Sequence, residues 1–449
     1  MTVVSGIESR RAAWKILLEQ EATGAFLKDL FPEGLSALRD DDAGLARAIC
    51  FGVLRHRRLL DFNLDAQAPR GIKGTKLRML LRVGAYQLFY LSGVPDFAAV
   101  NTAVEIAKYD LGKPESGFMN AVLKAVAREG LRTPPGNDFK SLGIRYSHPE
   151  WLVRRFGKEL KTGALEAALR RNNEEAPQWI RVNPRRGEPA ALPGLLAEAG
   201  ITLEPLPEPG APPLYYRILE GVGAAIRSPA FADGKFSFQD PVALWVVSLL
   251  DWHPGLSLLD ACSAPGGKAA LTLELAASRG EALEGARIVC GDASFQRLRR
   301  IGDAQLRLGH RELLPVCVEA GSGAFRAPFD RILLDVPCSN LGVLRRRPEA
   351  RWNWTPEKIT ALAHRQREML ESASALLNPG GRLVYATCSA EAEETVDVVR
   401  GFLAKHPEFQ IVDAGGTVPA SLCRDGFLRV WPGETDYDGF FAAALTREG

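Results

Sequence analysis

Residues 256–268 read LSLLDACSAPGGK and run directly into AALTLELAAS at residues 269–278. The first segment begins as a short apolar strand, the second has helical periodicity, and two adjacent glycines lie in the turn between them. Paired glycines remove side chains where a turn must be tight and where a ligand must approach the backbone. The stretch therefore predicts a strand, a ligand-binding loop and a helix in succession.

The alternation of strands and helices continues toward the C-terminus. ARIVCGD, FDRILLD and RLVYATCS are strand-like, whereas SFQRLRRIGDAQLRLG and TPEKITALAHRQREML are helical. This pattern predicts an α/β fold with a doubly wound, largely parallel sheet, whose ligands bind at the carboxyl ends of the strands. We place this domain at residues 236–449.

Two further domains are expected before it, because a chain of 449 residues suggests about three domains. Residues 1–134 carry apolar residues every three or four positions, which predicts an all-helical domain. RTPPGNDF at residues 132–139 breaks this period and is typical of a linker. Residues 135–235 mix helical and strand-like signals, and we expect a linker and a small α+β module there.

The composition is that of an ordinary globular protein, with 46% hydrophobic and 24% charged residues. The first residues lack the apolar core of a signal peptide, and no apolar run has membrane-spanning length, so we expect a cytoplasmic protein. Nothing in the sequence requires more than a monomer. The seven cysteines form no CxxC pair, so neither a disulfide framework nor a metal site is indicated.

A net charge of +2 is too small to identify a nucleic-acid partner, so a basic surface would have to be local. One cluster of cations in the helical domain fits either a solvated helical face or an RNA contact: Arg55, Arg57, Arg58, Arg70, Lys73, Lys76, Arg78 and Arg82. A second, at residues 345–354, reads RRRPEARWNW and combines cations for phosphates with aromatic faces for unstacked bases. Its position beside a strand end favours RNA contact.

The glycine loop narrows the class of ligand. GGKA lacks the spacing and the Ser/Thr of a phosphate loop, which argues against a nucleoside triphosphate. The Gly-x-Gly-x-x-Gly pattern of dinucleotide-binding proteins is also absent. Asp292 ends the next strand, where an acid suits the hydroxyls of a ribose. These features favour S-adenosylmethionine.

Two cysteines follow core strands, Cys338 after FDRILLD and Cys388 at the end of RLVYAT, and both are expected to face one cleft. Carbon 5 of cytosine is a weak nucleophile, and a thiolate that adds to carbon 6 makes carbon 5 reactive toward a methyl donor. An acid near ring nitrogen 3 would assist the addition, and Asp335 is placed for this role. Four other cysteines are interpreted as buried core residues: Cys50, Cys290, Cys317 and Cys423.

The segments DACSAPGGK, LLDVPCSNLGVLRRRPEARW and LVYATCS resemble the RNA cytosine-5 methyltransferases, closest to the bacterial small-subunit ribosomal RNA group called RsmB, Sun or Fmu. FGVLRHRRLLD and VGAYQLFYL resemble the NusB-like RNA-binding domain of that group, so the resemblance spans nearly the whole chain. It implies a class I, Rossmann-like methyltransferase domain after an all-α NusB-like domain and a small α+β (RRM- or ferredoxin-like) module. It also implies S-adenosylmethionine as cofactor and small-subunit (16S) ribosomal RNA as partner.

The resemblance assigns Cys388 as the nucleophile and Cys338 as the residue that assists product release. The contacts to the cofactor that it implies are Cys262, Ser263, Ala264, Pro265, Gly266, Gly267, Lys268, Asp292 and Asp335. The family offers a Gly-Asp after the third strand, whereas this chain has Glu319 followed by AGSG at residues 320–323. Glu319 is the candidate for the adenine contact.

Other functions stay open on the sequence. A DNA cytosine-5 methyltransferase would use the Pro-Cys thiol, and the second cysteine and the helical domain argue against it. A small-molecule methyltransferase leaves the helical domain unexplained. A non-catalytic RNA-binding or assembly factor would not need both cysteines, and another RNA such as tRNA is an alternative substrate.

Overall fold

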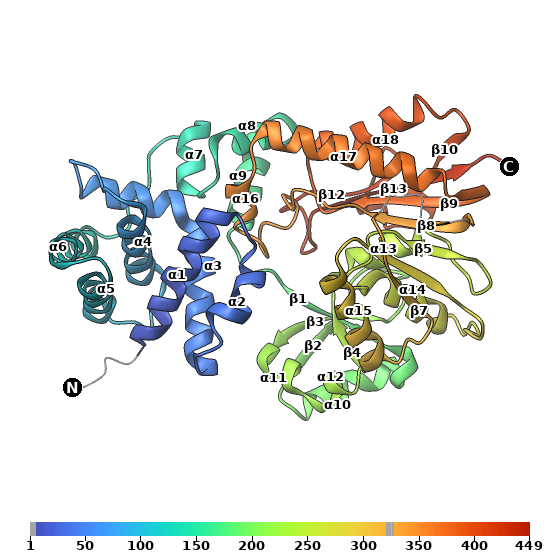
Figure 1. Cartoon of the computed structure of the whole chain (residues 1–449), viewed down its shortest axis with the longest axis horizontal. Coiled ribbons are helices and arrows are strands. Elements are labelled where there is room, and N and C mark those ends of the chain that lie inside the picture. The colour runs from blue at the N-terminus through green and yellow to red at the C-terminus, as the bar shows by residue number, and fades with distance from the viewer. Residues whose placement is uncertain (1–5, 320–324, 326) are drawn as a thin grey trace. The chain divides into compact units, whose positions relative to one another are not determined.

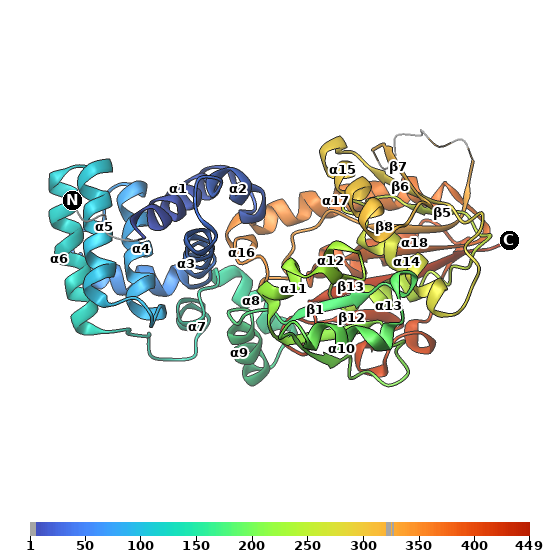
Figure 2. The same cartoon turned by 90° about the horizontal axis from the view of Figure 1, so that it is seen from below.

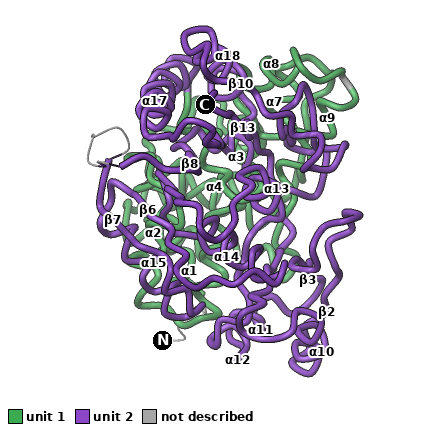
Figure 3. Tube along the Cα trace, turned by 90° about the vertical axis from the view of Figure 1, so that its right-hand side faces the viewer, with its two compact units in different colours: residues 1–175, 344–354 green, residues 176–343, 355–449 purple. Residues whose placement is uncertain are grey.

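A computed structural model of the chain describes residues 6–319, 325 and 327–449. The chain forms two compact units, shown in Figure 3. The first comprises Met1–Glu175 and Leu344–Trp354, and the second comprises Ala176–Val343 and Thr355–Gly449. A short segment that lies between the two cysteine motifs in sequence therefore belongs to the N-terminal unit.

The first unit is all-helical in its described residues (Figure 1). Its helices are α1 (Ile7–Thr23), α2 (Leu27–Gly34), α3 (Asp40–Ala66), α4 (Thr75–Tyr90), α5 (Asp96–Asp110), α6 (Lys113–Glu129), α7 (Phe139–Arg145), α8 (Glu150–Glu159), α9 (Thr162–Arg171) and α16 (Ala350–Asn353). Helices α1 to α6 enclose one hydrophobic core, with α4 buried throughout its middle. The all-helical fold predicted for residues 1–134 is confirmed, and α7 to α9, which follow the predicted boundary, belong to the same compact unit.

The basic cluster of α3 and α4 is partly structural. Arg82 is 4% exposed, and its guanidinium donates to both carboxylate oxygens of Asp61 at 2.8 and 2.9 Å. Arg78 pairs with Asp65 at 2.9 Å, and Arg57 pairs with Glu21. These acids balance the arginines, so this part of the cluster is neither a simple solvated face nor an unopposed cationic surface.

The predicted RNA contact at residues 345–354 is wrong for Arg351. This side chain is fully buried in the first unit and donates hydrogen bonds to Ser147 O, Asn172 O and Asn173 Oδ1 at 2.8 to 3.1 Å. The indole of Trp352 donates to Leu54 O at 2.8 Å. The arginine and the tryptophan attach the segment to the helices, because their long side chains reach main-chain carbonyl oxygens of the first unit.

The second unit begins with a small antiparallel sheet in the order β2-β3-β1-β4. Its strands are β1 (Gln178–Val182), β2 (Thr202–Pro205), β3 (Tyr215–Glu220) and β4 (Phe236–Phe238), and its helices are α10 (Leu192–Ala197), α11 (Val222–Arg227) and α12 (Pro229–Ala232). The helices pack on one face of this sheet through a separate core (Figure 2). This is the predicted α+β module.

The larger sheet has the order β11-β12-β13-β9-β8-β5-β6-β7, with β10 paired to β13. Its strands are β5 (Leu258–Asp260), β6 (Ile288–Asp292), β7 (Leu313–Cys317), β8 (Phe329–Asp335), β9 (Leu377–Thr387), β10 (Phe409–Val412), β11 (Cys423–Arg424), β12 (Phe427–Val430) and β13 (Phe440–Arg447). Strands β5 to β9 pair in parallel, and the pairs among β9 to β13 are antiparallel. The predicted doubly wound sheet is confirmed.

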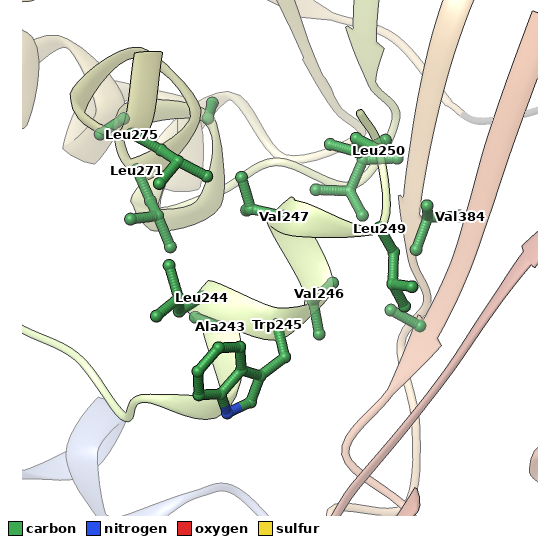
Figure 4. Packing of buried hydrophobic residues seen from close by; sticks show 14 of the residues in the cluster. Ala243, Leu244, Trp245, Val246, Val247, Leu249, Leu250, Leu271, Leu275 and Val384 are labelled. Atoms are coloured by element: carbon green, nitrogen blue, oxygen red, sulfur yellow. The ribbon is translucent and has the colours of Figure 1, made fainter. Parts of the chain in front are cut away.

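Helices cover both faces of this sheet (Figure 1). They are α13 (Val242–Ser248), α14 (Gly267–Ser278) and α15 (Phe295–Leu308) on one face, and α17 (Pro356–Ser374) and α18 (Val396–Leu403) on the other. Successive strand residues point to opposite faces, so Leu258 joins the first core and Leu259 the second. Figure 4 shows part of the first core, where Leu244 lies beside Leu271 and Leu249 beside Val384.

The cysteine expectations are confirmed for Cys50 and Cys290, which are buried. Cys423 is half-buried. The expectation is wrong for Cys317, which is exposed at the end of β7, the outermost strand of the sheet in the described part of the chain, where most side chains are exposed. Among the described residues, no helix combines the length and the apolar character that crossing a membrane requires.

Candidate active site

Three acidic residues end parallel strands at one edge of the large sheet. Asp260 ends β5, Asp292 ends β6 and Asp335 ends β8. β5 lies between β6 and β8, so the chain crosses from one half of the sheet to the other at this point. The carboxyl ends of strands at such a crossing form the ligand crevice of doubly wound sheets.

The glycine loop lies at this crossing and is held closely by its surroundings. Gly266 has φ of +89°, a left-handed conformation that disfavours other residues, and it precedes α14 directly. A Cβ on Gly267 would lie 3.1 Å from Nε2 of Gln239. Nη1 of Arg181 in β1 donates to the Gly267 carbonyl oxygen at 2.7 Å. The loop is therefore a fixed turn without side chains at its two glycines, so a ligand in the crevice can approach its main chain closely.

Lys268 and Asp335, both predicted site residues, form an ion pair of 2.6 Å between Nζ and Oδ2. Burial works to lower the pKa of Lys268, but the Asp335 carboxylate outweighs burial and the pKa is raised. A charge on Cys388 also raises this pKa, so the ammonium lies within electrostatic reach of that sulfur. A nearby cation favours the thiolate form of a cysteine.

Asp260 is 2% exposed, and its Oδ2 accepts a hydrogen bond of 2.9 Å from the Ser263 hydroxyl. Its Oδ1 is buried and has no partner among the described residues. Burial raises the pKa of Asp260 to about 7, and the charges of Asp335 and Asp292 add to this effect. Two of the three acids meet a cation, since Lys268 pairs with Asp335 and the Arg297 guanidinium lies 3.4 Å from Asp292 Oδ2, whereas Asp260 keeps one buried oxygen available to a hydrogen-bond donor of a ligand.

The predicted contacts Cys262, Ala264 and Pro265 lie in the loop between β5 and α14, while Asp292 and Glu319 lie elsewhere. Asp292 is 4% exposed, and its Oδ1 accepts a hydrogen bond of 2.9 Å from Ser294 N at the start of α15. Glu319 is exposed, and its carboxylate pairs with Arg365 of α17 at 3.2 Å. The AGS segment at residues 320–322 and the following glycine lie outside the described residues.

The two predicted cysteines are brought together. Cys338 Sγ lies 2.8 Å from Cys388 Sγ, although 50 positions separate the residues in sequence. Asn340 adopts a left-handed φ of +60°, donates to Cys338 O at 2.9 Å and accepts from Cys388 Sγ at 3.4 Å. One amide side chain therefore contacts both cysteine loops, and asparagine is one of the few residues that adopt the left-handed conformation readily.

Sequence reasoning did not single out Asn340, Arg181 or Glu394. Asn340 stands inside the Pro-Cys motif and could have been noted. No sequence pattern indicated a buried role for Arg181 or Glu394, because an arginine in a strand and a glutamate in an acidic run are ordinarily solvent-exposed. Both are buried here, at 1% and 0% exposure.

A parallel sheet with the order β7-β6-β5-β8-β9, an antiparallel β13 beyond it and a ligand crevice at the β5 and β8 ends defines a Rossmann-like methyltransferase. Comparison with known proteins agrees with this class. The family model for 16S rRNA methyltransferase RsmB/F matches residues 247–446, that for the NusB family residues 7–128, and that for the RsmF/B-like ferredoxin-like domain residues 148–210.

Whole-chain relatives extend this match. Ribosomal RNA small subunit methyltransferase B of Vibrio cholerae serotype O1 is 34% identical over 98% of this chain and 97% of that protein. The corresponding protein of Salmonella agona is 34% identical over 95% of each chain. The crystal structure of PH0851 superposes with a TM-score of 0.80 at 25% identity and full coverage of both chains. The chain belongs to the RsmB/F family of methyltransferases, which confirms the resemblance predicted from its motifs.

Proposed function

We propose that this protein methylates carbon 5 of a cytosine in small-subunit ribosomal RNA, with Cys388 as the nucleophile and Cys338 assisting product release. The observation that carries the proposal is the 2.8 Å approach of the two sulfurs at the carboxyl edge of the sheet. The rRNA substrate follows from the names of the relatives in Vibrio and Salmonella. A DNA substrate or a purely structural role would leave the second cysteine without a purpose.

The cofactor of this proposal is S-adenosylmethionine, whose sulfonium supplies an electrophilic methyl group when it is bound. The residues present fit it: a turn of two adjacent glycines, and the buried Asp260, whose Oδ1 has no partner among the described residues. Residues 262–268 would hold the amino-acid end and Asp292 the ribose. Glu319 remains the candidate for the adenine, although its exposed pairing with Arg365 would have to give way.

In the proposed mechanism the Cys388 thiolate adds to carbon 6 of the cytosine, forming a carbon-sulfur bond and an enamine across the ring. Asp335 shares a proton with ring nitrogen 3 and so stabilises the electrons displaced by the addition. Carbon 5 would then take the methyl group, while the electron pair of the broken methyl–sulfonium bond would stay on the cofactor's sulfur, so that the cofactor would leave as a neutral thioether. Loss of the carbon-5 proton to a base returns an electron pair to the ring, the carbon-sulfur bond breaks, and Cys388 leaves as a thiolate.

Two features of the chain's own residues support these roles. Lys268 is an ammonium within electrostatic reach of Cys388, so it is placed to balance the negative charge that the sulfur carries in attack and departure. Cys338 lies close enough to the nucleophile to act on the same adduct, as the release step requires. The target base must also leave its stack to reach the sulfur, so RNA shape contributes to substrate choice. The helical unit and the small α+β module are proposed to supply that recognition.

The test is methyl transfer from labelled S-adenosylmethionine to unmodified small-subunit ribosomal RNA, with nucleoside analysis and with tRNA and duplex DNA as controls. We expect labelled 5-methylcytosine from the ribosomal RNA alone. Label in tRNA would reassign the substrate, and label at another atom would reject the cytosine-5 chemistry. If no RNA accepts label, assembly intermediates of the small subunit are tested next, and failure there would favour a non-catalytic assembly factor.

A further inference from the structure

Glu394 lies at the end of a short 3-10 turn, Ala392–Glu394, between β9 and α18, and it is fully buried. Its Oε1 accepts hydrogen bonds from Ser339 N at 2.9 Å and Gln366 Nε2 at 3.0 Å. Its Oε2 accepts from the hydroxyls of Ser339 and Ser389, each at 2.5 Å. A carboxylate offers about four acceptor positions, and all four are used here.

The partners of this carboxylate are the immediate neighbours of the two cysteines. Ser339 follows Cys338, and Ser389 follows Cys388. The two serine hydroxyls also lie 3.2 Å apart. One buried anion therefore joins the loop after β8 to the loop after β9.

Surrounding groups keep the carboxylate itself in place. Gln366 of α17 donates from the same nitrogen to Pro337 O, directly before Cys338, at 3.0 Å. The hydroxyl of Tyr385 in β9 donates to the main-chain oxygen of Glu394 at 2.7 Å. A buried polar network in which the members are satisfied is rigid, since each lost bond would leave a desolvated group without a partner.

We infer that Glu394 is a positioning residue that holds the Cys338 and Cys388 loops at the separation the methyl transfer needs. The inference rests on the proposed function, because it assigns Glu394 a role through the two cysteines rather than through contact with substrate. Each serine connects Glu394 to one of the two cysteines. Ser389 positions the attacking sulfur of Cys388, and Ser339 positions the sulfur of Cys338, which assists release.

The experiment compares Ser389→Ala, Ser339→Ala and Glu394→Gln in the full chain, with labelled cofactor and small-subunit RNA. Ser389→Ala should slow formation of the covalent RNA adduct, and Ser339→Ala should slow its breakdown so that trapped protein accumulates. Glu394→Gln keeps the size of the side chain but reverses part of the hydrogen bonding, so we expect both effects. Misplacement of a reacting group by about 1 Å costs about 100-fold in rate. For the three variants we therefore expect a loss of kcat of up to this size, with the KM for RNA and the affinity for the cofactor unchanged.

The matched control is Asp330→Asn at the amino end of β8, which alters another carboxylate that joins two segments: it accepts from Ser257 N, Ser257 Oγ and Asn378 Nδ2 at 2.8 to 2.9 Å. It should lower the unfolding temperature as the Glu394 variant does, while adduct formation and breakdown stay at wild-type rates. A structural role alone would make the two carboxylate variants alike, and wild-type adduct kinetics in both serine variants would overturn the inference. Cys388→Ala is run in parallel: if it still transfers methyl groups, the proposed function fails, whereas an inactive Cys388→Ala with unaffected serine variants rejects the positioning role alone.

Discussion

Nη1 of Arg181 donates a hydrogen bond of 2.7 Å to the carbonyl oxygen of Gly267, so the small antiparallel sheet is joined to the glycine loop at the start of α14. The same guanidinium pairs with Glu274 further along α14, with a closest approach of 2.5 Å, and both side chains are buried. His310 contacts the Glu274 carboxylate at 2.8 Å. The loop proposed to bind the cofactor is therefore held from outside the parallel sheet.

Arg181→Met is expected to lower the free energy of unfolding by about 3–5 kcal/mol, because it leaves the Glu274 carboxylate buried without its principal cation. The measurement is urea denaturation of the full chain. Arg181→Met combined with Glu274→Leu should recover much of the loss, since it removes both charges together. A loss below about 1 kcal/mol in the single variant, the value of an exposed pair, would contradict a structural role for this ion pair.

Cys388→Ala should abolish methyl transfer while cofactor binding persists, since the alanine cannot add to carbon 6. Cys338→Ala should instead retain protein covalently on the RNA, because the attacking thiol is intact and release is impaired. Denaturing electrophoresis with labelled RNA distinguishes the two. Cys423→Ala, a half-buried cysteine in β11, is the control and should leave turnover unchanged. Absence of any adduct with Cys338→Ala would count against its role in release.

The pH dependence of stability should carry a contribution from Asp260. Its pKa is about 7 in the folded protein against an ordinary value of 3.8, so between these pH values the folded state holds a proton that the unfolded state has lost. Stability then falls as pH rises through this window, since the native state binds more protons than the unfolded state. Asp260→Asn should remove that part of the slope between pH 4 and 7 in denaturant titrations. Equal slopes in both proteins would show that Asp260 ionises normally.

Gly342→Ala should impair activity through the cysteine loops. A Cβ at this position would lie 2.3 Å from Gly439 O and 2.8 Å from Cys388 O, and both neighbours are backbone atoms that cannot rotate away. Gly342 N also donates to Cys388 O at 3.0 Å, so displacement moves the loop of the proposed nucleophile.

Gly401→Ala in α18 is the matched control, because nothing lies within 4 Å of its added Cβ. It should leave turnover unchanged and stabilise the helix by about 1 kcal/mol. Equal kcat values for the two alanine variants would show that the contact at Gly342 is not needed for catalysis.

Local sequence patterns predicted the strand ends well. The apolar run before Asp260, the glycine pair and the strands before Cys338 and Cys388 each encode their element within about ten residues, as hydrophobic period and turn residues do. Parallel strands in a doubly wound sheet place their carboxyl ends at one edge. This rule was enough to expect that Cys338 and Cys388 share a cleft, and their sulfurs lie 2.8 Å apart.

The same patterns failed where burial decides a residue's role. Arg351 had the composition of an RNA-binding loop, yet its guanidinium is enclosed by main-chain carbonyls of the helical unit. Cys317 lies on a strand of apolar character but at the last position of the sheet, so no second strand covers it. Strand order and loop docking are properties of the whole fold, and a local window does not contain them.

The sequence by itself determined the all-helical and α/β classes of the fold, the glycine turn and the two cysteines that follow core strands, because these depend on residue type and on spacing of a few positions. Only the tertiary structure decided that Glu394 joins both cysteine loops and that Arg181 holds Gly267, since these partners are separated by 55 and 86 positions. A charged side chain makes fixed hydrogen bonds of this kind only after the fold has removed it from water. Its burial depends on residues far away in the sequence, so no local sequence pattern indicates it.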